Sequence, residues 1–197
     1  MVAAPLSEEV FDRVFRTART YNGFTDEPVG EAQLRAIWDL MKWGPTSANQ
    51  EPMRIVWCTS DEAKARLAEC TSGTNAEKIL KAPVTAILGM DMEFYERLPE
   101  LFPHADARSW FVGKPALIEE SAFRNSTLQG AYFIVATRLL GLDTGPMSGF
   151  DAEKVNAAFF AGMSVKANFI STLGHGDPST IFPRLPRLTF EDVSTIV

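Results

Sequence analysis

The sequence predicts a layered fold of helices and strands, of either the α/β or the α+β class. Two apolar runs, residues 54–58 and 84–90, have the length and composition of strands, and helical patterns lie before and between them. The second run is apolar enough for a central strand that is buried on both sides. Such strands need helices packed against a sheet, so a layered architecture follows.

The composition fits one folded domain and excludes several classes of partner. Of 197 residues, 46% are hydrophobic, which is enough for a substantial core. Acidic residues (25) outnumber basic ones (19) and there is no basic block, so nucleic acid is not an expected partner. The longest uncharged run, residues 125–137, is shorter than the roughly 18 apolar residues of a membrane span. With no signal-peptide pattern at the N-terminus, we expect a cytoplasmic protein without a membrane partner.

The first helix is expected to begin after Ser7 and to end near Ala18, with four apolar residues on one buried face. These residues are Val10, Phe11, Val14 and Phe15. Arg19 follows in an irregular segment that also contains Thr20 and Asn22. An arginine there can hold a phosphate through two parallel hydrogen bonds, and a solvated surface charge is the alternative.

A second helix, residues 31–43, leads into a polar turn. Its buried face is predicted to contain Leu34, Ile37, Trp38 and Met41. The helix stops at Gly44 and Pro45, because proline lacks an N–H donor and disfavours a helical conformation at the preceding residue. Thr46, Ser47 and Asn49 follow, and each can donate and accept hydrogen bonds. They suit the polar edge of a heterocycle, or they only satisfy the helix end and the turn.

Two further helices separate the strands. Ser60 is the expected N-cap of a helix that runs to about residue 70. A short helix over residues 75–81 then places Asn75 and Lys78 on one face, where a solvent-exposed pair is the default interpretation. The two cysteines, Cys58 and Cys70, form neither a metal-binding nor a Cys-x-x-Cys pattern.

Residues 94–115 are rich in aromatic residues and proline and show weak periodicity. This segment also carries His104 and Arg108. It is either a lid over a binding site or a small satellite core packed beneath a loop.

The longest helix is predicted over residues 116–142, and its second half is apolar on every side. Such a helix is buried all round, at the centre of the domain or at a subunit interface, and we expect a dimer. A glycine-rich loop follows at residues 141–150. Its backbone N–H groups can hydrogen-bond a flat ligand, and a plain turn between helices is the alternative.

The C-terminal part is predicted to contain a helix near residues 152–160 and a strand near residues 167–173. His175 lies in a glycine turn after that strand, where a structural role is expected. The tail places Arg184 and Arg187 between prolines, which indicates an extended arm that is too irregular to fold by itself.

Taken in order, these features resemble the nitroreductase family of flavoproteins across nearly the whole chain. The order is an arginine after the first helix, Pro-Thr-Ser-Ala-Asn after the second, Asn-x-x-Lys before the central strand, and Gly-Pro-Met-Ser-Gly-Phe after the long helix. An arginine-bearing tail completes the pattern. Residues 43–49, 101–111 and 142–150 are most similar to the branch of malonic semialdehyde reductases, or 3-hydroxypropanoate dehydrogenases, of bacterial pyrimidine degradation.

The resemblance implies a single α+β domain over residues 1–197, with a mostly antiparallel central sheet flanked by helices. It also implies an intertwined homodimer with one FMN in each of two interface clefts. The arm of each subunit, about residues 180–197, would reach the partner subunit.

The family's cofactor positions carry over to this sequence residue by residue. Contacts to the FMN phosphate match Arg19, Arg184 and Arg187, with Thr20 and Asn22 beside Arg19. The polar stretch that lines the flavin matches Thr46, Ser47 and Asn49. Asn75 matches a position beside the pyrimidine part of the ring, and Lys78 one near the nicotinamide or a flavin carbonyl. The loop whose backbone meets the flavin near its reactive nitrogen matches Pro146, Met147, Ser148 and Gly149.

The sequence also departs from the family pattern. Ala18 and Asn22 stand where cations are common, so the phosphate is expected to depend on Arg19 and the tail arginines. Glu51 stands where many relatives have glutamine, and Met53 where many have tryptophan.

The implied activity is a ping-pong hydride transfer, in which NADH or NADPH reduces FMN, leaves, and is replaced by the substrate on the same face. The expected substrate is malonic semialdehyde, which is reduced to 3-hydroxypropanoate. Its carboxylate needs a cation, for which His104 and Arg108 are the candidates and Arg124 a rival. A broad nitroaromatic or quinone reductase is the alternative, and a non-catalytic flavin-binding protein a further one. No catalytic triad and no metal site are expected.

Overall fold

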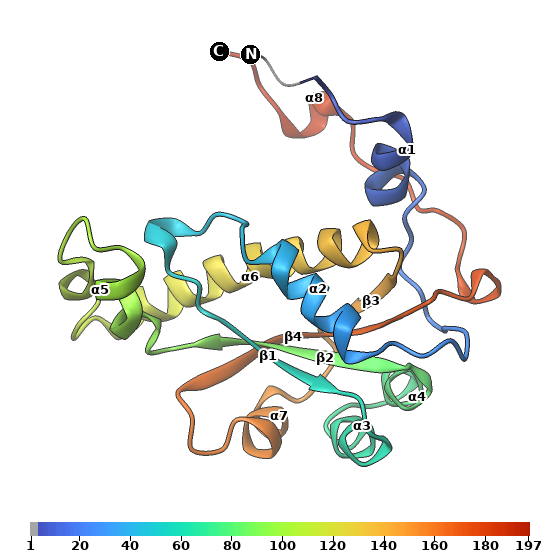
Figure 1. Cartoon of the computed structure of the whole chain (residues 1–197), viewed down its shortest axis with the longest axis horizontal. Coiled ribbons are helices and arrows are strands. Elements are labelled where there is room, and N and C mark those ends of the chain that lie inside the picture. Colours follow the sequence, from blue (N-terminus) through green and yellow to red (C-terminus); the bar gives the residue numbers. More distant parts are fainter. Residues whose placement is uncertain (1–3) are drawn as a thin grey trace.

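In the computed structural model, which describes residues 4–197, four strands form one antiparallel sheet with the order β1-β2-β4-β3 (Figure 1). The strands are β1 (Met53–Cys58), β2 (Val84–Asp91), β3 (Asp143–Met147) and β4 (Val165–Gly174). Every pairing is antiparallel, so the α+β prediction is confirmed and the α/β alternative is wrong. The strand β2 lies between β1 and β4 and is buried at seven of its eight positions, as its continuous apolar run predicts.

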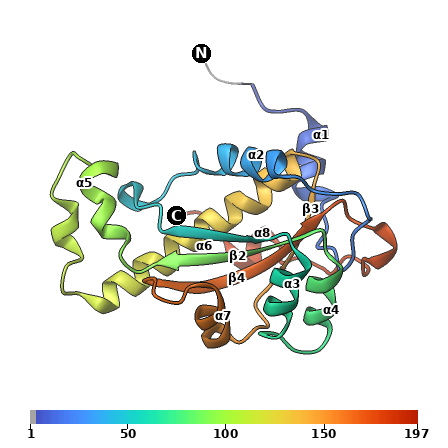
Figure 2. The same cartoon turned by 60° about the horizontal axis from the view of Figure 1, so that its bottom comes forward.

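Helices cover both faces of the sheet (Figures 1 and 2). One face carries α2 (Glu31–Met41) and α6 (Pro115–Leu139). The other face carries α3 (Asp61–Ala68), α4 (Thr74–Lys81) and α7 (Ala152–Phe159). The Ser60 hydroxyl accepts a hydrogen bond from the Ala63 N–H at 3.1 Å, which confirms the predicted N-cap of α3.

Each helix layer has its own apolar core. Between the sheet and the α2/α6 layer, the cluster includes Leu34, Ile37, Met41, Leu88 and Phe133. Between the sheet and the α3/α4/α7 layer, it includes Leu67, Ile79, Ile87, Val155 and Ile170. Ile87 and Leu88 are neighbours in β2 and enter opposite clusters, as the alternation of side chains along a strand requires.

The aromatic segment forms a third, smaller core. It contains α5 (Leu98–Leu101) between two short 3-10 turns, Phe94–Arg97 and Ala107–Trp110. Phe94 and Phe111 are buried, with ring centroids 4.9 Å apart in an edge-to-face arrangement. The satellite-core interpretation of this segment is therefore confirmed.

The first helix differs from its prediction. After α1 (Glu8–Phe11), residues Asp12–Arg16 form a π-helical turn, and the Thr17 N–H bonds to the Asp12 carbonyl at 2.9 Å. The wider turn changes the direction of the side chains that follow. As a result Val14 is buried but Phe15 is 65% exposed, so the expectation of one buried apolar face is wrong at Phe15.

The segment after α6 is a strand where a loop was predicted. Residues Asp143–Met147 pair with β4, and Pro146 lies opposite Ser171. Proline is tolerated there because β3 is an edge strand of the sheet. The alternative of a plain turn between helices is wrong as well.

Two apolar side chains that were predicted to be buried are exposed in the single chain. Trp38 on α2 is 37% exposed, and Leu139 at the end of α6 is 48% exposed. The arm beyond β4 has no regular structure over residues 181–189 and then forms α8 (Phe190–Val193). Among residues 4–197, no helix combines the length and apolar character needed to cross a bilayer.

Candidate functional site

A cleft of about 890 Å³ lies between the first helical segment, the end of α6 and the C-terminal arm. We call it the arginine cleft, because among residues 4–197 five arginines and no acidic residue line it. They are Arg16, Arg19, Arg138, Arg184 and Arg187. Three of them were predicted as phosphate contacts, so the structure brings that predicted group together.

Hydrogen bonds to backbone carbonyls hold the cleft together. The Arg19 guanidinium donates to the Phe182 carbonyl, and Arg184 Nη2 donates to the Ala18 carbonyl at 2.9 Å. The Asn22 amide donates to the Thr180 carbonyl at 2.9 Å. The arm therefore lies against residues 18–22 of its own chain.

The charges in this cleft are mostly uncompensated. Arg16 pairs with Glu8 and with Asp12, the latter at 3.3 Å. Within residues 4–197, the other four arginines of the cleft have no carboxylate oxygen within 4.0 Å of their guanidinium nitrogens. Guanidinium groups that bond only neutral carbonyls keep a net positive potential and suit an anionic ligand such as a phosphate.

The segment after Arg19 lies against the start of β3. Thr20 forms a parallel bridge with Thr144, and the Tyr21 N–H donates to the Thr144 carbonyl at 3.1 Å. This contact fixes Arg19 and Asn22 relative to the sheet.

The far end of β3 reaches a second group of predicted residues. Asn75 Nδ2 donates to the Gly149 carbonyl at 2.9 Å, and Lys78 follows Asn75 on α4. A Cβ on residue 149 would lie 2.8 Å from Asn75 Nδ2, so any other residue there would force the Asn75 amide to shift. Gly149 is five residues beyond Thr144, about 17 Å along an extended chain. The strand β3, with Pro146 and Met147, therefore joins the arginine cleft to the Asn75–Gly149 contact.

The backbone beside this contact has unused donors. Ser148 and Gly149 are exposed, and in residues 4–197 neither N–H donates a hydrogen bond. Lys78 is half-buried and forms no ion pair within 4.0 Å among the same residues. These groups remain able to donate to a ligand that lies along β3.

The predicted polar turn has a strained backbone. Ala48, Asn49 and Glu51 have φ angles of 48°, 50° and 43°. Outside glycine such left-handed conformations cost about 1 to 3 kcal/mol each, and they persist where the surrounding structure enforces them. We call residues 46–51 the strained turn.

A buried polar network on α6 enforces this conformation. Asn125 Oδ1 accepts from the Ser47 N–H at 2.8 Å, and Asn125 Nδ2 donates to Gln50 Oε1 at 3.0 Å. Gln50 Oε1 also accepts from the Ser121 hydroxyl at 2.8 Å, and Gln129 Oε1 accepts from the Met53 N–H at 2.9 Å. None of these residues was predicted as part of a site. The available signal was polar residues at positions 121, 125 and 129, which are four apart and share one face of the predicted helix.

Two of the three polar side chains predicted in this turn already form hydrogen bonds within the chain. Thr46 Oγ1 accepts from the Glu51 N–H at 3.2 Å, and Asn49 Nδ2 donates to the Leu101 carbonyl at 3.0 Å. The alternative that these groups satisfy the turn therefore holds for Thr46, whereas Asn49 connects the turn to α5. The Ser47 side chain is exposed.

In one chain the strained turn and the arginine cleft are far apart. The turn contacts α6 at Asn125, whereas the cleft contains Arg138, which is about 20 Å further along the helix axis at 1.5 Å per residue. The Asn75–Gly149 contact belongs to the helix layer on the other face of the sheet (Figures 1 and 2). The structure therefore separates Thr46, Ser47 and Asn49 from the other predicted cofactor residues.

The three residues predicted to bind the substrate carboxylate lie beside the strained turn. Two of them, Arg108 and Arg124, already pair with glutamates. Arg108 forms two bonds with Glu96, at 2.7 and 2.8 Å, and hydrogen bonding to Arg108 lowers the pKa of Glu96. Arg124 pairs with Glu120. His104 is exposed, and its ring lies edge-on to Phe102 at 5.4 Å. It is close in sequence to Leu101, which holds Asn49.

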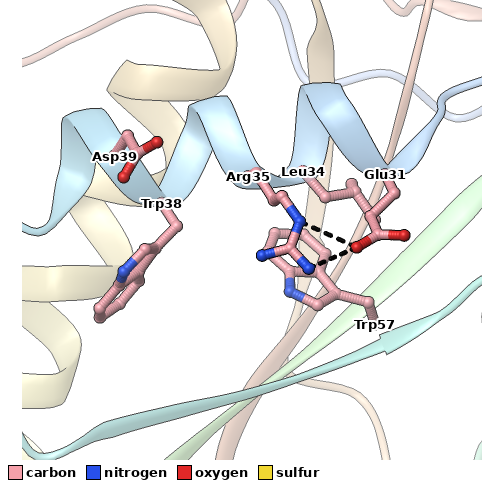
Figure 3. A pocket seen from close by; sticks show the side chains of 6 residues that line it. All are labelled: Glu31, Leu34, Arg35, Trp38, Asp39 and Trp57. Atoms are coloured by element: carbon pink, nitrogen blue, oxygen red, sulfur yellow. Dashed lines mark hydrogen bonds and ion pairs between the residues drawn. The ribbon is translucent and has the colours of Figure 1, made fainter.

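A second hollow, of about 370 Å³, lies between α2 and the edge strand β1 (Figure 3). Trp38 and Trp57 line it, and Arg35 projects toward Glu31, with Arg35 Nε 2.8 Å from the carboxylate. None of the predicted site residues reaches this hollow. It is not a candidate for the cofactor.

The two cysteines are buried. Burial raises the pKa of Cys58 to about 11, and burial also raises the pKa of Cys70. Both thiols are protonated at neutral pH, so neither is a ready nucleophile.

Comparison with known proteins gives a consistent family. The nitroreductase family model matches residues 15–174. A Burkholderia lata protein, provisionally named NADH dehydrogenase/NAD(P)H nitroreductase, is 58% identical over 191 residues, which are 97% of this chain and 98% of that protein. A Stenotrophomonas maltophilia protein with the same provisional name is 56% identical over 97% of each chain.

Solved structures show the same fold at low sequence identity. A provisionally named nitroreductase from Exiguobacterium sibiricum, solved in complex with FMN, has a TM-score of 0.83 at 16% identity over 99% of this chain and 100% of that chain. An enone reductase of gut-bacterial fatty acid metabolism has a TM-score of 0.82 at 15% identity, over 98% of this chain and 100% of that chain. The family model and the relatives that are more than half identical show that the chain belongs to the nitroreductase family.

Proposed function

We propose that this protein is an FMN-dependent NAD(P)H oxidoreductase. The observation that carries the proposal is the arrangement along β3, with unpaired arginines at one end and free backbone donors beside Asn75 at the other. A phosphate ester with a flat, carbonyl-rich ring needs these two kinds of group at its two ends. The names of the two relatives and the FMN bound in the Exiguobacterium protein support the same chemistry.

The residues present fit FMN. Arg19, Arg184 and Arg187 would hold the phosphate, with Thr20 and Asn22 beside it. Asn75 and Lys78 would face the polar edge of the ring, and Ser148 and Gly149 would donate their backbone N–H groups, with Pro146 and Met147 alongside. When bound, FMN supplies hydride transfer between a reduced nicotinamide and an acceptor. The chain itself supplies binding and orientation, and no side-chain nucleophile is needed.

We also propose that the working unit is a homodimer. In one chain the strained turn lies far from the arginine cleft, so Thr46, Ser47 and Asn49 reach the flavin only if a second copy brings its own turn. Exposed apolar side chains lie where a partner is needed, with Trp43 beside the turn 80% exposed and Phe15 beside the cleft 65% exposed. The arm, about residues 180–197, also exposes Phe182, Leu185 and Leu188, and would cover the partner subunit.

The proposed substrate is malonic semialdehyde. Its aldehyde carbon takes the hydride and its oxygen takes a proton, giving 3-hydroxypropanoate while NADH or NADPH is oxidised. His104 is the free candidate for the substrate carboxylate, and Arg108 becomes available if its pair with Glu96 opens. The support is the sequence similarity of residues 101–111 to that branch of the family.

A broad nitroaromatic or quinone reductase is the second candidate, and it agrees with the names of the relatives. A purely flavin-binding protein is the third. The test is to load the purified protein with FMN, add NADH without oxygen, and follow the flavin absorbance. Bleaching that malonic semialdehyde reverses supports the first candidate, and reversal by a nitroaromatic alone supports the second. Flavin binding without bleaching supports the third.

A further inference from the structure

One arginine of the cleft belongs to none of the predicted cofactor positions. Arg138 lies in the last turn of α6, yet it lines the same cleft as Arg19 and Arg184. Its Nη1 donates to the Val14 carbonyl at 2.9 Å. Its Nε is buried and has no hydrogen-bond partner within residues 4–197.

The surroundings of Arg138 are unfavourable for an unpaired cation. Burial lowers its pKa, the nearby charges of Arg13 and Arg184 lower it further, and only Asp143 acts in the opposite direction. An arginine side chain stays protonated under these conditions, so the protein contains a partly buried positive charge whose lost hydration is not compensated. The negative end of the α6 dipole offsets part of this cost. A bound anion would offset the remainder.

We propose that Arg138 contacts the phosphate of the bound flavin and sets the preference for FMN over riboflavin. The inference rests on the proposed function. It explains how the chain can bind the phosphate although Ala18 and Asn22 carry no positive charge, because Arg138 on α6 supplies one. The more exposed Arg184 and Arg187 lose more of their attraction to solvent screening than the half-buried Arg138 does.

A purely structural role is the competing explanation, and Arg13 provides the matched control. Arg13 Nε donates to the Arg138 carbonyl at 3.1 Å and Arg13 Nη2 to the Leu142 carbonyl at 3.4 Å. It ties the same two helices together but does not line the cleft. Arg13→Met thus loosens the junction without removing a cleft charge.

The experiment measures the Kd of FMN and of riboflavin by flavin fluorescence for the wild type and for Arg138→Gln, Arg138→Lys and Arg13→Met. Glutamine keeps a donor for the Val14 carbonyl and removes the charge, and lysine restores the charge. Arg138→Gln is expected to weaken FMN binding about tenfold or more, with riboflavin binding changed less than about twofold. Arg138→Lys is expected to recover part of the lost FMN affinity. Arg13→Met is expected to leave the ratio of the FMN Kd to the riboflavin Kd unchanged.

Three results would overturn the inference. They are an unchanged FMN Kd in Arg138→Gln, an equal loss of FMN and riboflavin, and a change of the ratio in Arg13→Met as large as that in Arg138→Gln. If Arg138→Gln does not fold, as judged by circular dichroism, Arg138→Lys tests the inference instead. Lysine forms a weaker bond to the phosphate, so it must still lower the ratio of FMN affinity to riboflavin affinity. A wild type that binds neither flavin refutes the proposed function itself, which separates that failure from this one.

Discussion

The arginine cleft lies against the C-terminal end of α6 and the strained turn against its middle, and the two regions satisfy their polar groups in opposite ways. In the turn, buried side chains of α6 take up the backbone donors of Ser47 and Met53, and Gln50 is bonded to Ser121 and Asn125. In the cleft, Arg19, Arg138, Arg184 and Arg187 find carbonyls but no carboxylates.

The difference separates groups that fix a shape from groups that remain available for a ligand. The bonds of this buried network hold a strained backbone in one conformation and occupy the groups that form them. Unpaired guanidinium groups weaken the empty protein slightly and strengthen the complex with an anion. Changes in the turn should therefore act mainly on folding, and changes in the cleft mainly on binding.

The largest expected effect is on folding, from Asn125→Ala. This change leaves the Ser47 N–H without its partner and removes one of the two bonds to the buried Gln50 Oε1, which should lower the free energy of unfolding by about 2 to 4 kcal/mol. Urea unfolding followed by circular dichroism measures it. The matched control is Asn168→Ala, which removes bonds to Ser126 and Thr127 at a half-exposed site and should cost less than half as much. Equal losses in the two variants would refute the special role of the network.

The next effect is on binding, from Arg19→Ala. Loss of one charge-assisted contact should raise the Kd of FMN about tenfold to a hundredfold, while the free energy of unfolding without FMN changes by less than about 1 kcal/mol. Equilibrium titration and urea unfolding give the two numbers. Arg35→Ala, which removes a surface arginine paired with Glu31, is the control and should change neither. A large loss of stability in Arg19→Ala without any loss of FMN affinity would show that the cleft acts on folding and not on binding.

A smaller effect is expected where β3 meets α4. Gly149→Ala puts a methyl group into the Asn75 amide and should weaken FMN binding by about 1 kcal/mol, and Asn75→Ala should do the same. Because both changes break one contact, the double variant should lose clearly less than the sum. Full additivity of the two losses in a titration would show that the contact does not act as a unit.

The smallest effect depends on pH. Burial raises the pKa of Glu51 above its ordinary value of 4.5, and Arg54 lowers it less. The folded state therefore favours the protonated acid, and this contribution to stability is lost as pH rises through the raised pKa. Glu51→Gln should be slightly more stable than the wild type at pH 7 and equal to it near pH 4. A gain of the same size at both pH values would exclude this cause.

Local patterns predicted much of the fold. The cap at Ser60, the stop at Pro45 and the apolar run of β2 each depend on neighbours in sequence, and each is found where it was expected. The errors occur where the tertiary structure overrides the local pattern. Residues 143–147 contain glycine and proline, which predicted a loop, whereas the structure forms the edge strand β3 there. The π-helical turn Asp12–Arg16 accounts for the exposure of Phe15.

The candidate site was predictable in its members but not in its arrangement. Arg19, Asn75 and Gly149 were named from motifs, and the structure connects them through β3. Arg138 and Asn125 were missed because their roles depend on which residues α6 meets at its C-terminal end and at its middle. The four-residue spacing of Ser121, Asn125 and Gln129 marks one face of the helix but does not tell which residues that face contacts.

The central claim is that the arginine cleft holds the phosphate of a flavin. The most direct test compares FMN with riboflavin binding to the wild-type protein at low and at high salt. At low salt FMN should bind at least about tenfold more tightly than riboflavin, and added salt should reduce the difference because it screens the arginines. Equal affinities for the two flavins at low salt, or a difference that added salt leaves unchanged, would contradict the claim.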